Sequence, residues 1–152
     1  MKTVFVKSFY VIGTAIRTSN EPGQAEKDIP GLWSRFLSGG LIEKIPNRIN
    51  NDVYCVYTDY EKDHTKPYTT ILGCKVSKLD NIPEGFIGKS ISGGNCSVFT
   101  ATGKIPEGVV FHEWVKIWNS GISRAYTADF EVYSEKAQNP DKAVIDIFVA
   151  VK

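Results

Sequence analysis

No apolar run in this 152-residue sequence approaches the ~20 residues that a helix needs to cross a bilayer. The N-terminal stretch MKTVFVKSFYVIGTAIRT alternates between apolar and polar residues, whereas a signal peptide has a continuous apolar segment and a small-residue cleavage site. The pattern favours a strand over a targeting sequence. We therefore expect a cytoplasmic protein that does not associate with membranes.

The sequence also has no excess of charge of either sign. Its 18 Lys and Arg residues are balanced by 17 Asp and Glu residues, which leaves a formal net charge of +1. Proteins that bind nucleic acids concentrate positive charge to neutralise phosphates. The composition therefore argues against direct binding of nucleic acid, and it is typical of a globular domain, with 42% hydrophobic and 23% charged residues.

Residues and motifs for metal or nucleophilic chemistry are scarce. Cys55, Cys74 and Cys96 are odd in number and have no C-x-x-C spacing, so reduced thiols are expected rather than disulfides or a zinc site. His64, in a polar loop, and His112, on a predicted helix, are both expected to face solvent. There is no G-x-S-x-G, G-x-G-x-x-G or P-loop pattern. The sequence thus predicts no metal, no cofactor and no enzyme activity.

What the sequence does contain is an internal repeat, with copies at about 1–80 and 84–152. Each copy runs through a strand-like segment, a helix and two further strands. Two such units predict an α+β domain in which a mostly antiparallel sheet carries one helix from each unit. A pseudo-twofold axis would relate the units, and a cleft on that axis between the helices and the sheet is a natural ligand site.

The repeat also predicts where the elements lie. The strand-like segments are 3–17, interrupted at Gly13, and 86–102, interrupted at Gly93 and Gly94. The helices are predicted at about 25–38, with Pro30 in the first turn or at a kink, and at about 108–119.

The paired strands show the repeat most clearly. The segment DVYCVYTDYEK (52–62) matches ADFEVYSEK (128–136), and this superposition sets Cys55 against Glu131.

Glu131 is the unusual residue of this segment, because it interrupts an aromatic, β-prone run where a buried charge is costly unless it is paired. Strand alternation places its side chain on the same face as Asp129 and Tyr133. Three interpretations are open. Glu131 could point to water, pair with a basic residue such as Arg124 or Lys116, or face an aromatic cleft and bind a cation. In the last case, desolvation would raise its pKa when no ligand is bound.

Aromatic residues gather on the predicted helices and on the paired strands. A stripe of aromatic residues at helical spacing is more often core than ligand site. Tryptophan, however, is hard to bury fully, because its N–H group needs a partner. Three tryptophans on two short helices therefore favour a partly open aromatic cleft.

Six segments, in this order, match a known family: LWSRF (32–36), IPNRINNDVYCVYTDY (45–60), YTTILGCKV (68–76), IPEGF (82–86), HEWVKIW (112–118) and DFEVY (129–133). The chain resembles the gyrase-inhibitor-like effector-binding domains, which occur at the C-terminus of some AraC- and MerR-type transcription regulators and as stand-alone proteins. It is most similar to the stand-alone proteins encoded in integron gene cassettes. The resemblance covers nearly the whole chain and implies a single effector-binding domain, 1–152.

The resemblance implies a pocket on the pseudo-twofold axis for a small lipophilic ligand, often a cation, with Glu131 as the partner of the positive charge. The other candidate ligand-binding residues lie on the matching strands and helices: Cys55, Tyr57 and Tyr133 on strands, and Trp33, Phe36, Trp114 and Trp118 on helices. Regulators of this family carry a helix-turn-helix region as well. We expect no operator binding by that route here, so a role in transcription would need a separate regulator protein.

Two alternatives to a binding module remain open from the sequence. Some relatives of this fold hydrolyse small electrophiles, and Glu131 could act as a general base near Tyr57 or Tyr133. The chain could also inhibit a nucleic-acid enzyme such as gyrase, although its net charge does not favour mimicry of DNA.

Overall fold

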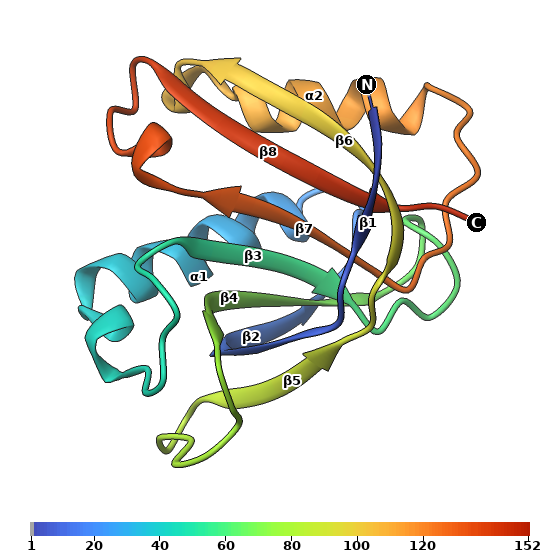
Figure 1. Cartoon of the computed structure of the whole chain (residues 1–152). Helices are drawn as coiled ribbons and strands as arrows, with labels where there is room; N and C mark the ends of the chain where they lie inside the picture. The colour runs from blue at the N-terminus through green and yellow to red at the C-terminus, as the bar shows by residue number, and fades with distance from the viewer. Residues whose placement is uncertain (1) are drawn as a thin grey trace.

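The computed structural model describes residues 2–152, which form one eight-stranded antiparallel sheet and two α-helices (Figure 1). Both helices lie behind the sheet in the view of Figure 1. The elements are β1 (Lys2–Val6), β2 (Phe9–Thr18), α1 (Ala25–Ser38), η1 (Leu41–Lys44), β3 (Val53–Thr58), β4 (Tyr68–Val76), β5 (Ile87–Ile91), β6 (Gly94–Gly103), η2 (Ile105–Glu107), α2 (Val109–Trp118), β7 (Ala128–Tyr133), η3 (Glu135–Ala137) and β8 (Ala143–Ala150), where η marks a 3₁₀ turn. The α+β class with an antiparallel sheet and two main helices is confirmed.

The strand order is symmetric. It runs β1-β6-β8-β7-β3-β4-β2-β5, and exchanging β1–β4 with β5–β8 gives the same order read from the other end. The first strand of each half pairs with the second strand of the other half, while β3 and β7 pair at the centre. We propose that the chain is one effector-binding domain formed by duplication of about 1–80 and 84–152, and this order supports the proposal.

The centre of the sheet fixes the position of the axis. Cys55 on β3 and Glu131 on β7 are direct partners across the antiparallel pair. They are also the two residues that the repeat superimposes, so the pseudo-twofold axis passes between them. Directly opposed residues point to the same face of a sheet, and the side chains of Cys55 and Glu131 therefore face the helices together.

The first segment of each half is two strands, but the predicted interruption at Gly13 is wrong. The break falls at Lys7 and Ser8, whereas Gly13 lies inside β2 and pairs with Gly73 of β4. A Cβ atom on either glycine would collide with the backbone of the opposite strand. Glycine is required here by close approach of the strands rather than by a turn.

The helices bury one stripe each. In α1 the buried side chains are Leu32 and Phe36, and in α2 they are Trp114 and Ile117. Burying a large apolar side chain stabilises a fold by about 1.5–3 kcal/mol, so these stripes dock the helices on the sheet. Pro30 lies inside α1 instead of in its first turn.

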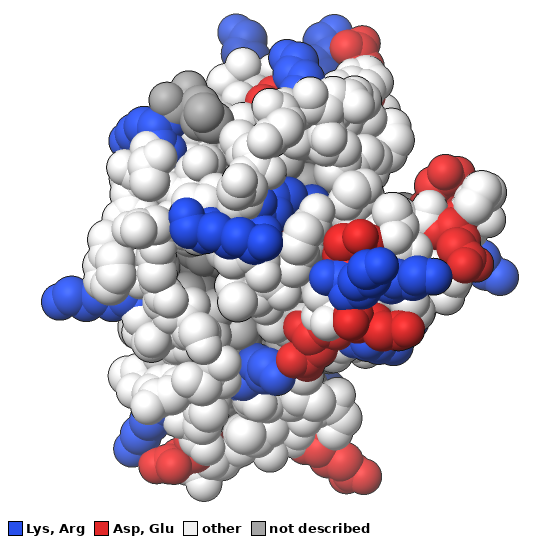
Figure 2. Space-filling view, turned by 90° about the vertical axis from the view of Figure 1, so that its right-hand side faces the viewer, with Lys and Arg blue, Asp and Glu red and all other residues white. Residues whose placement is uncertain are grey.

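The surface carries charges of both signs. On the face shown in Figure 2, Lys and Arg side chains are interspersed with Asp and Glu side chains and with large uncharged areas. Within residues 2–152, no helix combines the length and the apolar character needed to span a bilayer.

Candidate ligand-binding site

A cavity of about 700 Å³ lies between the two helices and the central strands. Its walls come from both halves of the chain. The lining residues are Asn20, Glu21, Ala25, Glu26, Ile29, Pro30, Trp33, Tyr57, Tyr60, His64, Thr65, Tyr68, Val110, Phe111, Trp114, Trp118, Arg124, Glu131 and Tyr133. Eight of these 19 residues are Trp, Tyr or Phe, and aromatic walls are common in sites that bind organic molecules.

Glu131 lies at the sheet side of this cavity and is only 1% exposed. Its Oε2 accepts hydrogen bonds from the Tyr57 hydroxyl at 2.7 Å and from Trp114 Nε1 at 2.7 Å. Its Oε1 accepts a hydrogen bond from the Tyr133 hydroxyl at 2.7 Å. All three donors are neutral. Three hydrogen bonds hold the carboxylate in place, but they do not balance its charge.

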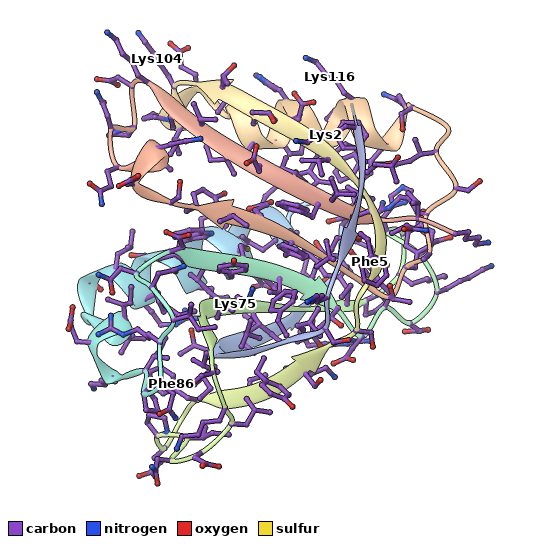
Figure 3. All side chains as sticks on the ribbon, viewed as in Figure 1. Lys2, Phe5, Lys75, Phe86, Lys104 and Lys116 are labelled. Atoms are coloured by element: carbon purple, nitrogen blue, oxygen red, sulfur yellow. The ribbon has the colours of Figure 1, made fainter. Side chains whose placement is uncertain are left out.

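The two basic residues considered for Glu131 lie elsewhere. Arg124 donates from Nη2 to Asp129 Oδ2 at 2.7 Å. Lys116 is on the outer side of α2 and its nearest carboxylate is Glu113, at 3.7 Å (Figure 3). Within residues 2–152, Glu131 forms no ion pair. Of the three interpretations, exposure to water and pairing with a basic residue are therefore wrong.

Burial raises the pKa of Glu131 above its ordinary value, because the surroundings solvate the charged form poorly. The hydrogen bonds from Tyr133, Trp114 and Tyr57, with a smaller contribution from Cys55, oppose this effect without cancelling it. Burial and the nearby carboxylate also raise the pKa values of Tyr57 and Tyr133 well above the usual range. Both tyrosines therefore stay neutral and act as hydrogen-bond donors.

Two aromatic pairs frame the carboxylate, one from each half of the chain. Trp33 of α1 meets Tyr133 of β7 edge to face, with ring centroids 4.7 Å apart. Trp114 of α2 meets Tyr57 of β3 in the same way, at 5.5 Å. Edge-to-face contacts fix the orientation of rings beyond what burial alone does, so both tyrosine hydroxyls are held towards Glu131.

The structure brings six of the eight predicted residues to the cavity: Trp33, Tyr57, Trp114, Trp118, Glu131 and Tyr133. Their part in ligand binding stays a prediction. Cys55 is fully buried beside Glu131 and does not line the cavity. Burial raises the pKa of its thiol, which keeps it neutral.

Phe36 does not line the cavity, and the prediction that it does so is wrong. It is 1% exposed and packs in the core under α1 with Leu32 and Leu72. Successive helix residues are rotated by about 100°. The stripe that contains Leu32 and Phe36 therefore faces the sheet, while Trp33 is rotated towards the cavity.

The prediction that His64 faces solvent is also wrong. Its ring is half-buried, lines the cavity and stacks on Trp118, with centroids 5.6 Å apart and planes 10° from parallel. Burial and the positive charge of Arg124 lower the pKa of His64. His112 is exposed, as predicted. A histidine in a polar loop has no periodicity, so no local pattern indicates this placement.

Sequence reasoning did not assign Asn20, Tyr68 or Arg124 to the cavity. The Tyr68 hydroxyl donates to Asn20 Oδ1 at 2.6 Å, and Asn20 Nδ2 donates to the His64 carbonyl at 2.9 Å. These bonds join the loop before α1 to the loop after β3, although 44 residues separate Asn20 from His64. Only tertiary structure reveals such contacts.

The comparisons with known proteins agree with this architecture. The model of the Cass2 family, described as integron-associated effector binding protein, matches residues 3–151. The chain belongs to this family. The family resemblance inferred from the sequence is thereby confirmed.

Two relatives and one structure of the same fold illustrate the range of this similarity. YobU of Bacillus subtilis (strain 168), whose name assigns it provisionally to transcriptional regulators, is 27% identical over 144 residues, which cover 92% of this chain and 90% of YobU. The crystal structure of the integron cassette protein VCH_CASS2, from the mobile metagenome of Vibrio cholerae, is 29% identical with a TM-score of 0.77, covering 99% of this chain and 95% of that one. The structure of SAV2435 bound to tetraphenylphosphonium has the same fold, at 17% identity and a TM-score of 0.81, covering 99% and 93% of the two chains.

Proposed function

We propose that this protein is a cytoplasmic effector-binding module for lipophilic or amphipathic organic cations, and that it is not an enzyme. One observation carries the proposal: the buried carboxylate of Glu131 lines an aromatic cavity and has no countercharge among residues 2–152. A buried carboxylate without a positive partner is unfavourable. A cationic guest would supply that partner.

The walls of the cavity favour the same class of guest. The rings of Trp33, Trp118 and Phe111 offer apolar surface and cation–π attraction, which contributes about 0.5–2 kcal/mol per contact. Glu21 and Glu26, both exposed, add negative charge among the lining residues. The volume of about 700 Å³ suits a guest of drug size.

The relatives support the proposal. SAV2435, which has the same fold, was solved with tetraphenylphosphonium, a lipophilic cation. YobU is named for the regulation of transcription. We propose that binding here serves to sequester the cation or to signal its presence through a separate regulator protein.

The first test is calorimetric titration with tetraphenylphosphonium. We expect Glu131→Gln to weaken binding by about 1–3 kcal/mol, the range for a charge-assisted contact. Glutamine fits the site, because its carbonyl can accept from Trp114 and Tyr57 while its amide donates to the Tyr133 hydroxyl. Glu43→Gln, an exposed residue outside the cavity, is the matched control. Equal affinity of the wild type and Glu131→Gln would disprove the assigned role.

The raised pKa of Glu131 beside two tyrosine hydroxyls also favours a second candidate, general-base hydrolysis of a bound electrophile. A hydrolase would convert its guest to product, and Glu131→Gln would abolish the turnover. We expect no product when the protein is incubated with candidate electrophiles and analysed by mass spectrometry.

A further inference from the structure

Arg124 is a second buried charge on the wall of the cavity. It precedes β7, lines the cavity and is only 6% exposed. Its Nη2 donates to Asp129 Oδ2 at 2.7 Å. Its Nε and Nη1 are also buried, and neither has a hydrogen-bond partner among residues 2–152. Buried donors are nearly always paired, so two unpaired donors on one guanidinium call for an explanation.

Asp129 bonds the guanidinium through Nη2 and makes no hydrogen bond to Nε or Nη1. Oδ1 accepts from the backbone N–H of Ala150 at 2.8 Å, and Oδ2 accepts from the Tyr60 hydroxyl at 2.5 Å as well as from Arg124. The ion pair therefore neutralises the charge of the guanidinium and still leaves part of its hydrogen-bonding capacity free.

Aromatic rings enclose the guanidinium. The centroids of Tyr126, Trp114 and Tyr60 lie 4.5, 5.6 and 5.9 Å from its central carbon. Tyr126 has a φ of 55°, in the left-handed region that non-glycine residues rarely adopt. Such a conformation costs about 1–3 kcal/mol, and here it sets the Tyr126 ring against Arg124. Ring faces attract the cation but cannot accept in-plane N–H bonds as an oxygen does.

Trp114 connects this group with Glu131. Its indole N–H donates to Glu131, and its ring lies against Arg124. The cavity thus has two polar positions separated by one indole: a carboxylate that needs a positive partner, and a charge-balanced guanidinium that needs hydrogen-bond acceptors.

We propose that Arg124 is a second ligand-binding residue, which donates a hydrogen bond from Nε or Nη1 to an oxygen of the guest when the side chains around the guanidinium shift to admit that oxygen. This inference rests on the proposed function and narrows it. The preferred guests are organic cations that also carry a carbonyl or carboxylate oxygen. Because Asp129 offsets the charge of Arg124, the arginine adds this selectivity without strongly repelling the cation.

The test compares three guests that differ at one position: benzyltriphenylphosphonium and its derivatives with a carboxylate or a carboxamide at the para position of the benzyl ring. The carboxylate and the carboxamide supply an ionic and a neutral acceptor respectively. We expect the wild type to bind the carboxylate about tenfold more tightly than the parent cation, or more, with the carboxamide between them, because hydrogen bonds that involve a charged group are the stronger ones. The readout is the ratio of two affinities of one protein, so changes common to both guests cancel.

Arg124→Lys keeps a positive charge beside Asp129 but removes Nε and Nη1. We expect the affinity ratio to fall to about one in this variant and to stay unchanged in Arg48→Lys, the matched control outside the cavity. If Arg124→Lys does not fold, Arg124→Met combined with Asp129→Asn removes both charges together, which proteins tolerate better than the loss of one partner. The ratio is expected to fall to about one in that variant as well.

The outcomes separate the two proposals. A ratio that Arg124→Lys leaves unchanged, or equal affinity of the wild type for all three guests, overturns the inference about Arg124. Failure of the parent cation to bind overturns the proposed function. Selective binding of the carboxylate alone would then still support the role of Arg124.

Discussion

Two carboxylates on one strand show how differently a fold can treat a buried charge. Asp129 and Glu131 are two residues apart on β7, face the same side of the sheet and are 0% and 1% exposed. Asp129 receives an arginine, a tyrosine hydroxyl and a backbone N–H. Glu131 receives three neutral donors and no positive charge. The charge of Asp129 is therefore balanced within the described residues, whereas the charge of Glu131 is not.

Because of this difference, the two carboxylates should affect different properties of the protein, namely its stability and its binding of a ligand. A buried ion pair contributes little net stability, but loss of one partner is costly because the other charge is left alone. A buried carboxylate held only by neutral groups lowers stability and makes a cationic guest more favourable. We therefore expect changes at Asp129 to act mainly on folding and changes at Glu131 to act mainly on binding.

The largest effect on stability is expected from Asp129→Asn. The substitution leaves Arg124 buried without its countercharge, which should lower the free energy of unfolding by about 3–5 kcal/mol. Urea unfolding followed by circular dichroism measures this loss. Asp80→Asn, at an exposed aspartate 3.7 Å from Lys78, should change stability by less than about 0.5 kcal/mol. A loss below about 1 kcal/mol in Asp129→Asn would contradict the structural role of the pair.

Glu131→Gln, in contrast to Asp129→Asn, should raise the free energy of unfolding at neutral pH. The folded protein holds the proton of Glu131 more tightly than the unfolded chain does, because burial raises its pKa above the ordinary 4.5. Below that value both states are protonated and the residue has no effect. As the pH rises from there through the raised folded pKa, the wild type loses stability. The loss is about 1.4 kcal/mol for each pH unit that separates the folded pKa from the unfolded pKa.

Unfolding curves at several pH values test this expectation. The difference in free energy of unfolding between Glu131→Gln and the wild type should grow from acidic to neutral pH, in favour of the variant. A difference that does not depend on pH would mean that Glu131 is not destabilised by burial.

Only part of this comparison could be predicted from the sequence. Strand alternation places Asp129 and Glu131 on one face, and the duplication locates the centre of the sheet, because both signals are local and periodic. These signals cannot show which of the two carboxylates Arg124 pairs with. Arg124 lies on an irregular segment, where no periodicity fixes the direction of a side chain.

The same limit explains the errors at Phe36 and His64. Helical spacing shows that Trp33 and Phe36 belong to the inner side of α1, but it cannot tell which of them meets the sheet and which meets the cavity. His64 stacks on Trp118 because loops distant in sequence pack together. Gly13 shows the converse case, since a residue that usually marks a turn lies within a strand where two backbones approach closely.

The smallest effects are expected from the tyrosines that hold Glu131, and they should be unequal. Tyr133 is the hydrogen-bond donor to Oε1, whereas Tyr57 shares Oε2 with Trp114. Tyr133→Phe should therefore remove the hydroxyl donor to Oε1 and raise the pKa of Glu131 further. Tyr57→Phe should raise this pKa by less, because Trp114 still donates to Oε2. Each loss should cost about 0.5–1.5 kcal/mol of stability at neutral pH.

The pH dependence of phosphonium affinity would report this inequality directly, because the guest is a permanent cation and we expect it to bind best when Glu131 is ionised. The pH at which affinity is half lost should move upward more in Tyr133→Phe than in Tyr57→Phe, and not at all in Tyr10→Phe, a partly exposed tyrosine on β2. His64 also lines the cavity and titrates, so the series is repeated with His64→Gln as background. Equal changes in the two tyrosine variants would show that the oxygens of Glu131 exchange their donors, and the carboxylate would then be less rigidly held than that of Asp129.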